Sequence, residues 1–294
     1  MTWKVAALYR FVEVTDVPAM QAVVKAACVK NDIVGTLLLA PEGINGTIAG
    51  PESGLDAIID FLDNKLGIRE GELKFSSAAE QPFRRLKVRN KKEIVTMRQP
   101  QANPAKAVGT YVEPEDWNTL LADNPDMIVI DTRNTYETAV GMFEGATDPQ
   151  TGTFVEFPEY VKKNLDPAKH KKVAMYCTGG IRCEKASSYM LAEGFEEVYH
   201  LKGGILKYLE TIPADESKWD GDCFVFDRRV AVGQDLQESP YMLCYGCRMP
   251  LSEEDTKHKA YEKGVSCHHC IDTLTPEKAH AFRVRHKQFM DGNL

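Results

Sequence analysis

The chain has 294 residues, of which 43% are hydrophobic and 27% charged, and its formal net charge is −7. This indicates a globular protein with two or three domains, and the acidic balance excludes general nucleic-acid binding, so any RNA contact must come from local basic surface. No apolar run reaches the roughly 18–20 residues that cross a bilayer. The first stretch is interrupted by Arg10 and Glu13 and is typical of a strand, not a signal peptide. We therefore expect a cytoplasmic protein with no membrane partner.

Residues 3–76 alternate between strand-like and helix-like patterns. Strands are predicted at 5–14, 33–39, 44–49 and 72–75, and helices at 17–31 and 55–66. The order β-α-β-β-α-β is that of a ferredoxin-like domain. The stretch EGINGT, which begins at Glu42, contains two glycines and an asparagine. These residues favour a hairpin turn over a ligand-binding loop.

A basic stretch follows this domain. Residues 83–98 contain seven Lys and Arg against one acid, Glu93. The alternation of Leu86 and Val88 predicts a strand whose cations point outward. Clustered Lys and Arg side chains supply affinity for the phosphate backbone of a nucleic acid. A strand face that is merely exposed to solvent has the same pattern, and it is the alternative. The residues expected to contact RNA are Arg84, Arg85, Lys87, Arg89, Lys91 and Lys92.

The second predicted domain spans residues 111–209, after a proline-containing linker at 99–108. Strands at 127–131, 173–176 and 198–201 alternate with helices, which is typical of a parallel sheet. Asp131, Arg133 and Glu137 are close in sequence. A carboxylate and a guanidinium this close favour a structural ion pair that fixes a loop. A catalytic acid–base pair is the less favoured alternative.

Cys177 begins the most informative loop of the chain. It lies where the strand at 173–176 ends and a glycine-containing turn leads into a helix at 184–191. Amides converge at such a turn and the helix dipole favours negative charge, so the pKa of a thiol there is lowered. Gly179 and Gly180 let the amides turn inward as an anion-binding nest. We predict that Cys177 is a nucleophile; the alternative is a buried apolar side chain.

The length of this loop limits which class of cysteine enzyme it can belong to. Four residues separate Cys177 from Arg182, one fewer than in a cysteine phosphatase loop. A loop of this size resembles that of the rhodaneses, which are sulfurtransferases whose ring of amides stabilises a cysteine persulfide. The loop residues expected at the substrate are Thr178, Gly179, Gly180 and Ile181.

Two residues at the end of the loop are further catalytic candidates. Arg182 either holds an anion or an RNA phosphate, or pairs with a nearby acid that fixes the shape of the loop. Cys183 lies in the first turn of the helix. There it either resolves a sulfenate or persulfide on Cys177 or packs under the loop as a small residue.

The C-terminal part contains two C-x-x-C pairs separated by nineteen residues. With eight cysteines in the chain, this arrangement indicates metal binding and thiol chemistry, not a disulfide framework. The spacing is zinc-ribbon-like and predicts a structural, tetrahedral zinc site without an open position; free thiols without metal are the alternative. His268 and His269 are weaker candidates, and a helix at 276–290 carries a second basic surface. The expected ligands are Cys244, Cys247, Cys267 and Cys270.

Several of these motifs together resemble a known family. DTRNTYETAVGMFEGA, CTGGIRC and HLKGGILKYLE resemble a rhodanese domain. With EGINGT, FRRLKVRNKKEIV, YVEPEDWN, MYCTGGIRCEKAS and CFVFDRRVAV, nearly the whole chain is similar to the rhodanese-containing tRNA uridine hydroxylases, also called TrhO. The resemblance implies hydroxylation of wobble uridine in tRNA to 5-hydroxyuridine, with molecular oxygen as co-substrate, the anticodon region as partner and Cys177 as the active cysteine.

The route of the reaction stays open at this point. The sequence shows no 2-His-1-carboxylate set, haem ligand pattern or flavin fingerprint, so no flavin or nucleotide cofactor is expected. One route is addition of the Cys177 thiolate to C6 of the ring, which raises the electron density at C5; a persulfide or sulfenate on Cys177 is another. The alternative function is a sulfurtransferase acting through a Cys177 persulfide. A non-catalytic binding module is disfavoured because the loop retains its cysteine.

The predicted organisation is a mixed α/β chain in three parts. Residues 1–98 form a ferredoxin-like α+β domain with the basic strand. Residues 109–218 form a rhodanese-like α/β domain with a parallel sheet, and residues 219–294 form a small cysteine-rich, zinc-ribbon-like module.

Overall fold

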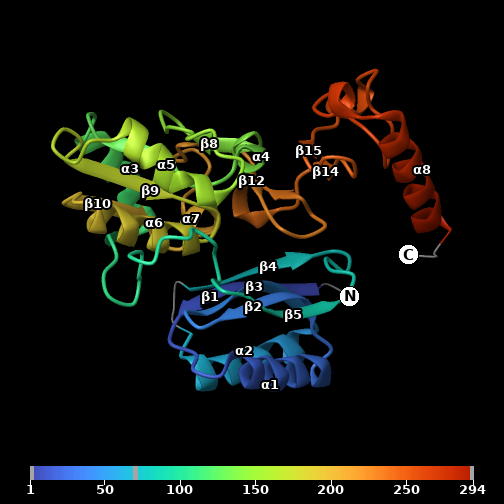
Figure 1. Ribbon diagram of the computed structural model, residues 1–294, viewed down its shortest axis with the longest axis horizontal. Helices are drawn as coiled ribbons and strands as arrows, with labels where there is room; N and C mark the ends of the chain where they lie inside the picture. The colour runs from blue at the N-terminus through green and yellow to red at the C-terminus, as the bar shows by residue number, and fades with distance from the viewer. Residues whose placement is uncertain (1–2, 69–71, 292–294) are drawn as a thin grey trace.

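The computed structural model describes residues 3–68 and 72–291, which form an N-terminal domain, a central domain and a C-terminal module in chain order (Figure 1). The N-terminal sheet carries its two helices on one face, and the central domain lies against the opposite face. The C-terminal module extends to one side of both domains. The mixed α/β class predicted from the sequence is confirmed.

The N-terminal domain is a five-stranded sheet with strand order β4-β1-β3-β2-β5. β5 runs parallel to β2, and the other neighbours are antiparallel. The first four strands and two helices have the predicted ferredoxin-like order, and the basic strand adds a fifth strand at the edge. The elements are β1 (Trp3–Phe11), α1 (Val17–Lys30), β2 (Val34–Ala40), β3 (Gly43–Gly50), α2 (Glu52–Leu66), β4 (Leu73–Ala78) and β5 (Leu86–Asn90).

Local sequence signals set the ends of these elements. The side chain of Asp16 accepts a 2.9 Å hydrogen bond from the amide of Ala19 at the start of α1, which satisfies one of the free amides there. α2 ends at Gly67, whose φ of 63° is left-handed and free of strain only in glycine. A Cβ at Gly43 would lie 1.9 Å from the carbonyl oxygen of Arg10, so the hairpin between β2 and β3 requires glycine.

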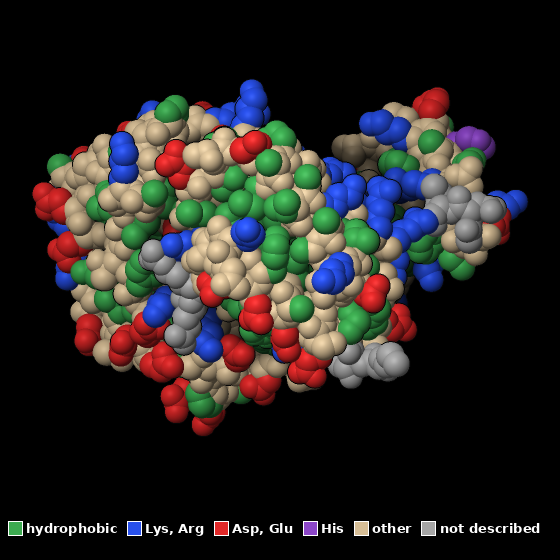
Figure 2. Space-filling model, turned by 90° about the horizontal axis from the view of Figure 1, so that it is seen from below, with side chains coloured by type: hydrophobic (Ala, Val, Ile, Leu, Met, Phe, Trp, Pro, Cys, Tyr) green, Lys and Arg blue, Asp and Glu red, His purple; other side chains and the backbone are tan. Residues whose placement is uncertain are grey.

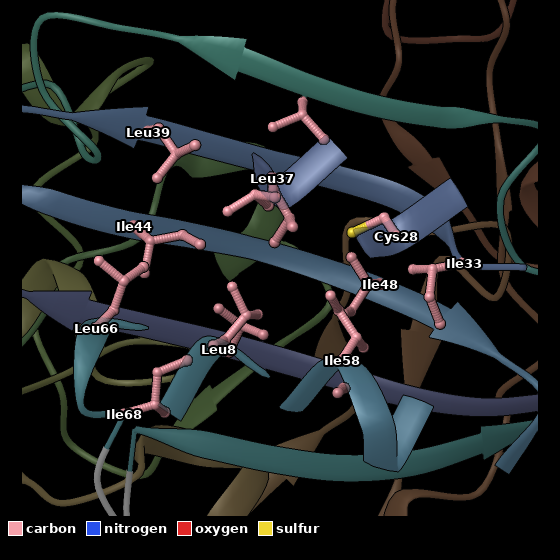
Figure 3. Packing of buried hydrophobic residues seen from close by; sticks show 14 of the residues in the cluster. Leu8, Cys28, Ile33, Leu37, Leu39, Ile44, Ile48, Ile58, Leu66 and Ile68 are labelled. Atoms are coloured by element: carbon pink, nitrogen blue, oxygen red, sulfur yellow. The ribbon is translucent and has the colours of Figure 1, made fainter. Parts of the chain in front are cut away.

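The core of this domain lies between the sheet and its helices (Figure 3). Side chains alternate across a strand, so Ala6 and Leu8 join this core while Ala7 and Tyr9 face the other way. Leu37 and Leu39 of β2 join the same core. The second face of the sheet therefore presents a different set of side chains to the central domain.

The central domain is built on a four-stranded parallel sheet with order β6-β10-β9-β7, as the alternating pattern predicts. α6 begins at Ile181, three residues before the predicted start at 184, because Gly180 in a left-handed conformation precedes it. The elements are β6 (Thr110–Val112), α3 (Pro114–Asp123), β7 (Ile128–Asp131), α4 (Thr135–Thr138), β8 (Gly141–Phe143), η1 (Phe154–Glu156), α5 (Phe157–Asn164), β9 (Lys172–Tyr176), α6 (Ile181–Ala192), β10 (Glu197–Leu201) and α7 (Gly204–Thr211).

The chain stays attached to this domain beyond residue 218, where the predicted third part begins. β11 (Trp219–Gly221) pairs antiparallel with β8, and the ring of Trp219 lies 5.1 Å from that of Phe143. β12 (Cys223–Phe224) and β13 (Ala231–Val232) then form a hairpin. Cys223 is buried in the core of the central domain.

The C-terminal module is small and has little regular structure before its last helix. It contains β14 (Met242–Leu243), β15 (Pro250–Leu251) and α8 (Pro276–Met290), with single helical turns η3 (Asp255–Lys257) and η4 (Ile271–Thr273) around them. The turn η2 (Gln234–Leu236) precedes the module and packs on the central domain, where Gln234 donates to the carbonyl oxygens of Leu209 and Ile212. The hydroxyl of Thr275 accepts a hydrogen bond from the amide of Lys278 at the start of α8. Throughout residues 3–68 and 72–291, every helix falls short of the length and apolar character needed to cross a membrane.

Candidate active site

The loop between β9 and α6 places the Cys177 sulfur under a converging backbone, as predicted. The amide of Gly180 donates a 3.1 Å hydrogen bond to this sulfur. Gly180 has a φ of 102°, and a Cβ there would lie 2.9 Å from the hydroxyl oxygen of Tyr9. Glycine is therefore required both by the turn and by the close approach of the N-terminal domain.

The surroundings of Cys177 favour the thiolate. Burial alone would raise the pKa of this thiol. Hydrogen bonds from the Cys183 thiol and amide and from the Gly180 amide, together with the charge of Arg182, lower it to about 5. Because this pKa lies below neutral pH, the sulfur is ionised there, and the thiolate is the nucleophilic form of cysteine.

Cys183 lies beneath the loop and is fully buried. Burial, followed by the hydrogen bond to Cys177 and its negative charge, raises the pKa of Cys183 well above the ordinary value of 9.0. Its sulfur also lies 3.5 Å from the hydroxyl oxygen of Thr132. Cys183 is thus a neutral thiol that donates a hydrogen bond to the Cys177 sulfur.

Arg182 pairs with a carboxylate inside the protein. Its guanidinium donates two hydrogen bonds to Glu137, at 2.6 and 2.7 Å, and Glu137 is fully buried. Of the two roles expected for Arg182, pairing with a nearby acid is the one observed. The expected structural ion pair forms between Asp131 and Arg133, whose guanidinium donates to both carboxylate oxygens of Asp131.

A cavity of about 480 Å³ opens above the loop, between the N-terminal sheet and the central domain. Thr178, Gly179 and Ile181 line it together with Cys177 and Arg182, whereas Gly180, which was also expected at the substrate, is not among the lining residues. Most other lining side chains are apolar or aromatic. Those from the N-terminal domain include Tyr9, Asn45, Lys74, Phe75 and Phe83, and those from the central part of the chain include Asn134, Tyr136, Phe154, Phe226 and Arg229.

Two tyrosines converge on one carboxylate beside this cavity. The hydroxyl groups of Tyr9 and Tyr111 donate to the same oxygen of Glu184, at 2.7 and 2.9 Å. Burial raises the pKa of Glu184, and the two hydrogen bonds oppose that rise. Because Tyr9 comes from β1 and Glu184 from α6, this contact fixes the N-terminal sheet against the active-site helix.

A buried lysine joins the two domains at a second point. Lys185 on α6 donates to Glu42 at 2.8 and 2.9 Å and to Glu93 at 2.6 Å. The Glu42 carboxylate also accepts a hydrogen bond from the amide of Ile94. The first residue of EGINGT is therefore an interdomain contact as well as part of a hairpin turn.

The predicted RNA-contacting cations lie elsewhere on the surface. β5 is an edge strand, and none of the six residues lines the cavity, although Phe83 just before them does. Lys87 is partly buried and the other five are exposed. Figure 2 shows Lys and Arg side chains gathered where the body of the protein meets the C-terminal module.

The four cysteines of the C-x-x-C pairs form one cluster, with all sulfurs within 4.8 Å of one another. The sulfur of Cys244 lies 3.9 Å from that of Cys270, and the sulfur of Cys247 lies 3.7 Å from that of Cys267. Tetrahedral zinc with bonds of about 2.3 Å requires sulfur–sulfur separations of about 3.8 Å. The donors thus fit a structural metal site, and the two histidines between Cys267 and Cys270 are not part of the cluster.

Sequence reasoning missed the residues that the N-terminal domain contributes, above all Tyr9 and Lys74. Each lies in a strand that carries other polar residues, Lys4 and Arg10 in β1 and Ser76 and Ser77 in β4, so nothing local distinguishes it from a solvent-facing residue. A lysine in a strand of a ferredoxin-like sheet is usually exposed, whereas Lys74 is only 7% exposed.

Comparisons with known proteins match these two domains. The family model described as "UPF0176 acylphosphatase like domain" matches residues 3–94. The model described as "Rhodanese-like domain" matches residues 113–211. The tRNA uridine(34) hydroxylase of Rhizobium leguminosarum bv. trifolii (strain WSM2304) is 55% identical over 284 residues, which cover 97% of this chain and 92% of the relative.

Solved structures resemble each domain separately. A rhodanese-like domain from Anabaena sp. is 18% identical and covers 38% of this chain and 78% of its own, with a TM-score of 0.31. An acylphosphatase from Coxiella burnetii is 10% identical and covers 30% of this chain and 93% of its own, with a TM-score of 0.24.

The matches define a class of protein in which an acylphosphatase-like domain is joined to a rhodanese-like domain. At 55% identity over nearly its whole length, the chain belongs to the tRNA uridine(34) hydroxylase family.

Proposed function

We propose that this chain hydroxylates the wobble uridine of tRNA at C5, with molecular oxygen as co-substrate and 5-hydroxyuridine as product. The observation that carries the proposal is the cavity of about 480 Å³ that Cys177 lines. The 55% identity to a tRNA uridine(34) hydroxylase supports the same substrate.

The cavity suits one extruded base. Its volume lies in the range of about 300–1,000 Å³ that small-molecule sites occupy. Aromatic side chains such as Tyr136 and Phe226 offer faces for stacking, and Asn45 and Asn134 offer amides for the edge of a base. Enzymes that act on a base remove it from the stack, and an anticodon base, being single-stranded, is extruded at low cost.

Cys177 is the proposed nucleophile. Its thiolate adds to C6 of the uracil ring, which raises the electron density at C5, where oxygen enters. Loss of the C5 proton and cleavage of the sulfur–C6 bond then restore the ring. One oxygen atom of O₂ is retained in the product and the other leaves as water, with two electrons supplied by a thiol reductant.

The neighbouring loop residues position this sulfur and the substrate. The Gly180 amide and the Cys183 thiol stabilise the thiolate, and Arg182, held by Glu137, fixes the shape of the loop. Thr178, Gly179 and Ile181 contact the base from the cavity wall.

The tRNA is proposed to bind through its anticodon region, and the activity is accordingly placed in the cytoplasm. The exposed cations before and within β5 supply phosphate contacts, and α8 supplies further ones. On α8, Arg283 pairs with Glu262 at 2.6 Å, so part of this second basic surface is neutralised. Zinc at the four cysteines is proposed as structural, because four thiolates leave no open position.

The decisive experiment incubates the purified protein with tRNA lacking the modification, ¹⁸O₂ and a thiol reductant. Nucleoside mass spectrometry is expected to show 5-hydroxyuridine carrying one labelled oxygen atom. Cys177→Ser should abolish the product, whereas the matched cysteine variant Cys28→Ala should retain it, because Cys28 lies in the N-terminal core.

The same preparation distinguishes the alternative function. Unchanged nucleosides together with strong thiosulfate:cyanide sulfur transfer, lost in Cys177→Ser, would replace the hydroxylase proposal with a sulfurtransferase. Full hydroxylation by Cys177→Ser would remove the nucleophile from the mechanism.

A further inference from the structure

Lys74 on β4 is a buried cation inside the interdomain cavity. The residue is 7% exposed and lines the cavity together with Cys177. A methyl group added at Gly179 would lie 3.9 Å from its Cδ, and one added at Gly203 would lie 3.6 Å from its Cε. The side chain thus leaves the N-terminal sheet and extends along two glycine turns of the central domain.

The charges around Lys74 are predominantly negative. Burial lowers the pKa of Lys74 to about 8, while the charges of Cys177, Glu184 and Glu72 oppose this shift and that of Lys207 adds to it. Its Nζ also lies 4.9 Å from the centre of the Tyr9 ring, a favourable cation–π contact. The amine is therefore protonated at neutral pH, next to an ionised sulfur.

The other cation beside Cys177 is Arg182. Arg182 is held by both oxygens of Glu137. The other groups that lower the pKa of Cys177 most are the Cys183 thiol and amide and the Gly180 amide, all of which are neutral donors. The Tyr9 hydroxyl, also neutral, lies close enough to the sulfur to interact with its charge. Among the described residues that line the cavity, Lys74 is the one cation from the N-terminal domain.

We propose that Lys74 is a positioning residue of the Cys177 site: the N-terminal domain supplies its ammonium, and this charge adds to the stabilisation of the Cys177 thiolate by the loop itself. The full electrostatic environment of the cysteine loop then exists only when the two domains are docked. The proposal rests on Cys177 as nucleophile in the proposed function, and not on hydroxylation itself.

The cost of burying Lys74 supports a role beyond packing. A lysine in an apolar cavity loses hydration that a methionine of similar length would not lose. The ammonium regains this energy from the thiolate and the nearby carboxylates. Removing its charge should therefore destabilise the thiolate more than the fold.

The test is the pH dependence of Cys177 alkylation by iodoacetamide, measured by peptide mass spectrometry on the full-length protein. We expect the wild-type rate to rise through a midpoint near the Cys177 pKa of about 5. It should rise again as Lys74 deprotonates near pH 8, because a less stabilised thiolate is more nucleophilic. Lys74→Gln is expected to raise the first midpoint by about one pH unit and to remove the second rise.

Two further variants make the result specific. Lys74→Arg, which stays charged, should keep the low first midpoint and lose the second rise. Lys207→Gln removes an exposed charge nearby and should retain both inflections. An unchanged first midpoint in a folded Lys74→Gln protein would overturn the proposal. If Lys74→Gln does not fold, a second rise that persists in Lys74→Arg would overturn it.

Failure of this proposal is distinct from failure of the proposed function. Alkylation requires neither tRNA nor oxygen, so the midpoints report on Lys74 even if no hydroxyuridine forms. Conversely, hydroxylation lost in Cys177→Ser with unshifted alkylation in Lys74→Gln would retain the function and remove Lys74 from it.

Discussion

Lys185 and Glu42 are separated by 143 positions in the sequence, yet the ammonium of one lies 2.8 Å from the carboxylate of the other. Lys185 lies on the helix that follows the Cys177 loop, and Glu42 lies in the turn between β2 and β3. Glu93 completes the contact at 2.6 Å. The helix that begins at the cysteine loop is therefore held directly by the N-terminal domain.

This contact predicts that Lys185→Met destabilises the protein. The Lys185 side chain is 2% exposed, whereas Glu42 and Glu93 are 26% and 20% exposed. Removing one partner of a buried ion pair leaves the others unpaired, at a cost of about 2–3 kcal/mol here because water reaches the carboxylates. Urea unfolding measures the change.

The matched control for that variant is Lys207→Met, which breaks an exposed pair with Glu210. Its effect should stay within about 0.5 kcal/mol, the range of surface ion pairs. Equal stability of Lys185→Met and wild type would show that the contact does not hold the domains together.

Glu137→Gln is predicted to change how stability depends on pH. Burial would raise the pKa of Glu137, but Arg182 outweighs it and holds the pKa below the ordinary value of 4.5. A carboxyl group with a lowered folded-state pKa stabilises the fold above its unfolded value and loses this contribution as the pH falls through the folded value. The free energy of unfolding of wild type should therefore decrease in acid.

In Glu137→Gln this acid-dependent decrease should be smaller. At neutral pH the variant should be less stable by about 3 kcal/mol, because Arg182 keeps a buried charge without its partner. Urea unfolding over a pH series tests both effects. Glu159→Gln, an exposed change, is the control. Parallel pH curves for wild type and Glu137→Gln would contradict the assignment.

The parts that were predicted from sequence are those whose signals are local. A strand, a cysteine, two glycines and a helix follow one another in the Cys177 loop, and the four cysteines carry their spacing with them. The alternation of apolar residues likewise indicated both sheets. Each of these features can be read from a single contiguous stretch.

The interdomain contacts could not be predicted in this way. Tyr9 and Glu184 are 175 positions apart and meet only because two separately folded domains dock. The sequence predicted an ion pair among Asp131, Arg133 and Glu137 without indicating which carboxylate binds the guanidinium. In the structure Arg133 binds Asp131, and Glu137 binds Arg182. Proximity in sequence identified the charged cluster but not which charges pair.

Cys183→Ser and Cys183→Ala are predicted to differ. If Cys183 acts as a hydrogen-bond donor to Cys177, serine replaces it and alanine does not. Cys183→Ala should raise the pKa of Cys177 by about one unit, as measured by alkylation, while Cys183→Ser should stay close to wild type. A resolving role would instead require sulfur, so loss of hydroxylation in Cys183→Ser with an unshifted Cys177 pKa would establish that role.

The cysteine cluster predicts about one zinc ion per chain by metal analysis of reductively purified protein. Cys267→Ser should lose the metal and loosen the C-terminal module, which limited proteolysis would detect. Cys28→Ala should retain the metal, because Cys28 lies in the N-terminal core. Metal-free protein with an equally resistant module would contradict a structural zinc site.

The cations near β5 predict a salt-dependent part of tRNA binding. The triple variant Arg84→Gln, Arg85→Gln, Arg89→Gln should bind tRNA more weakly, and the slope of log affinity against log salt should fall by about 0.7–0.9 for each lost phosphate contact. The variant Lys162→Gln, Lys163→Gln, Lys169→Gln removes as many exposed charges from the central domain. An equal loss in both variants would mean that net charge alone governs binding. Because none of the three arginines lines the cavity, Cys177 alkylation should be unchanged, so weakened binding would be separated from any damage to the active site.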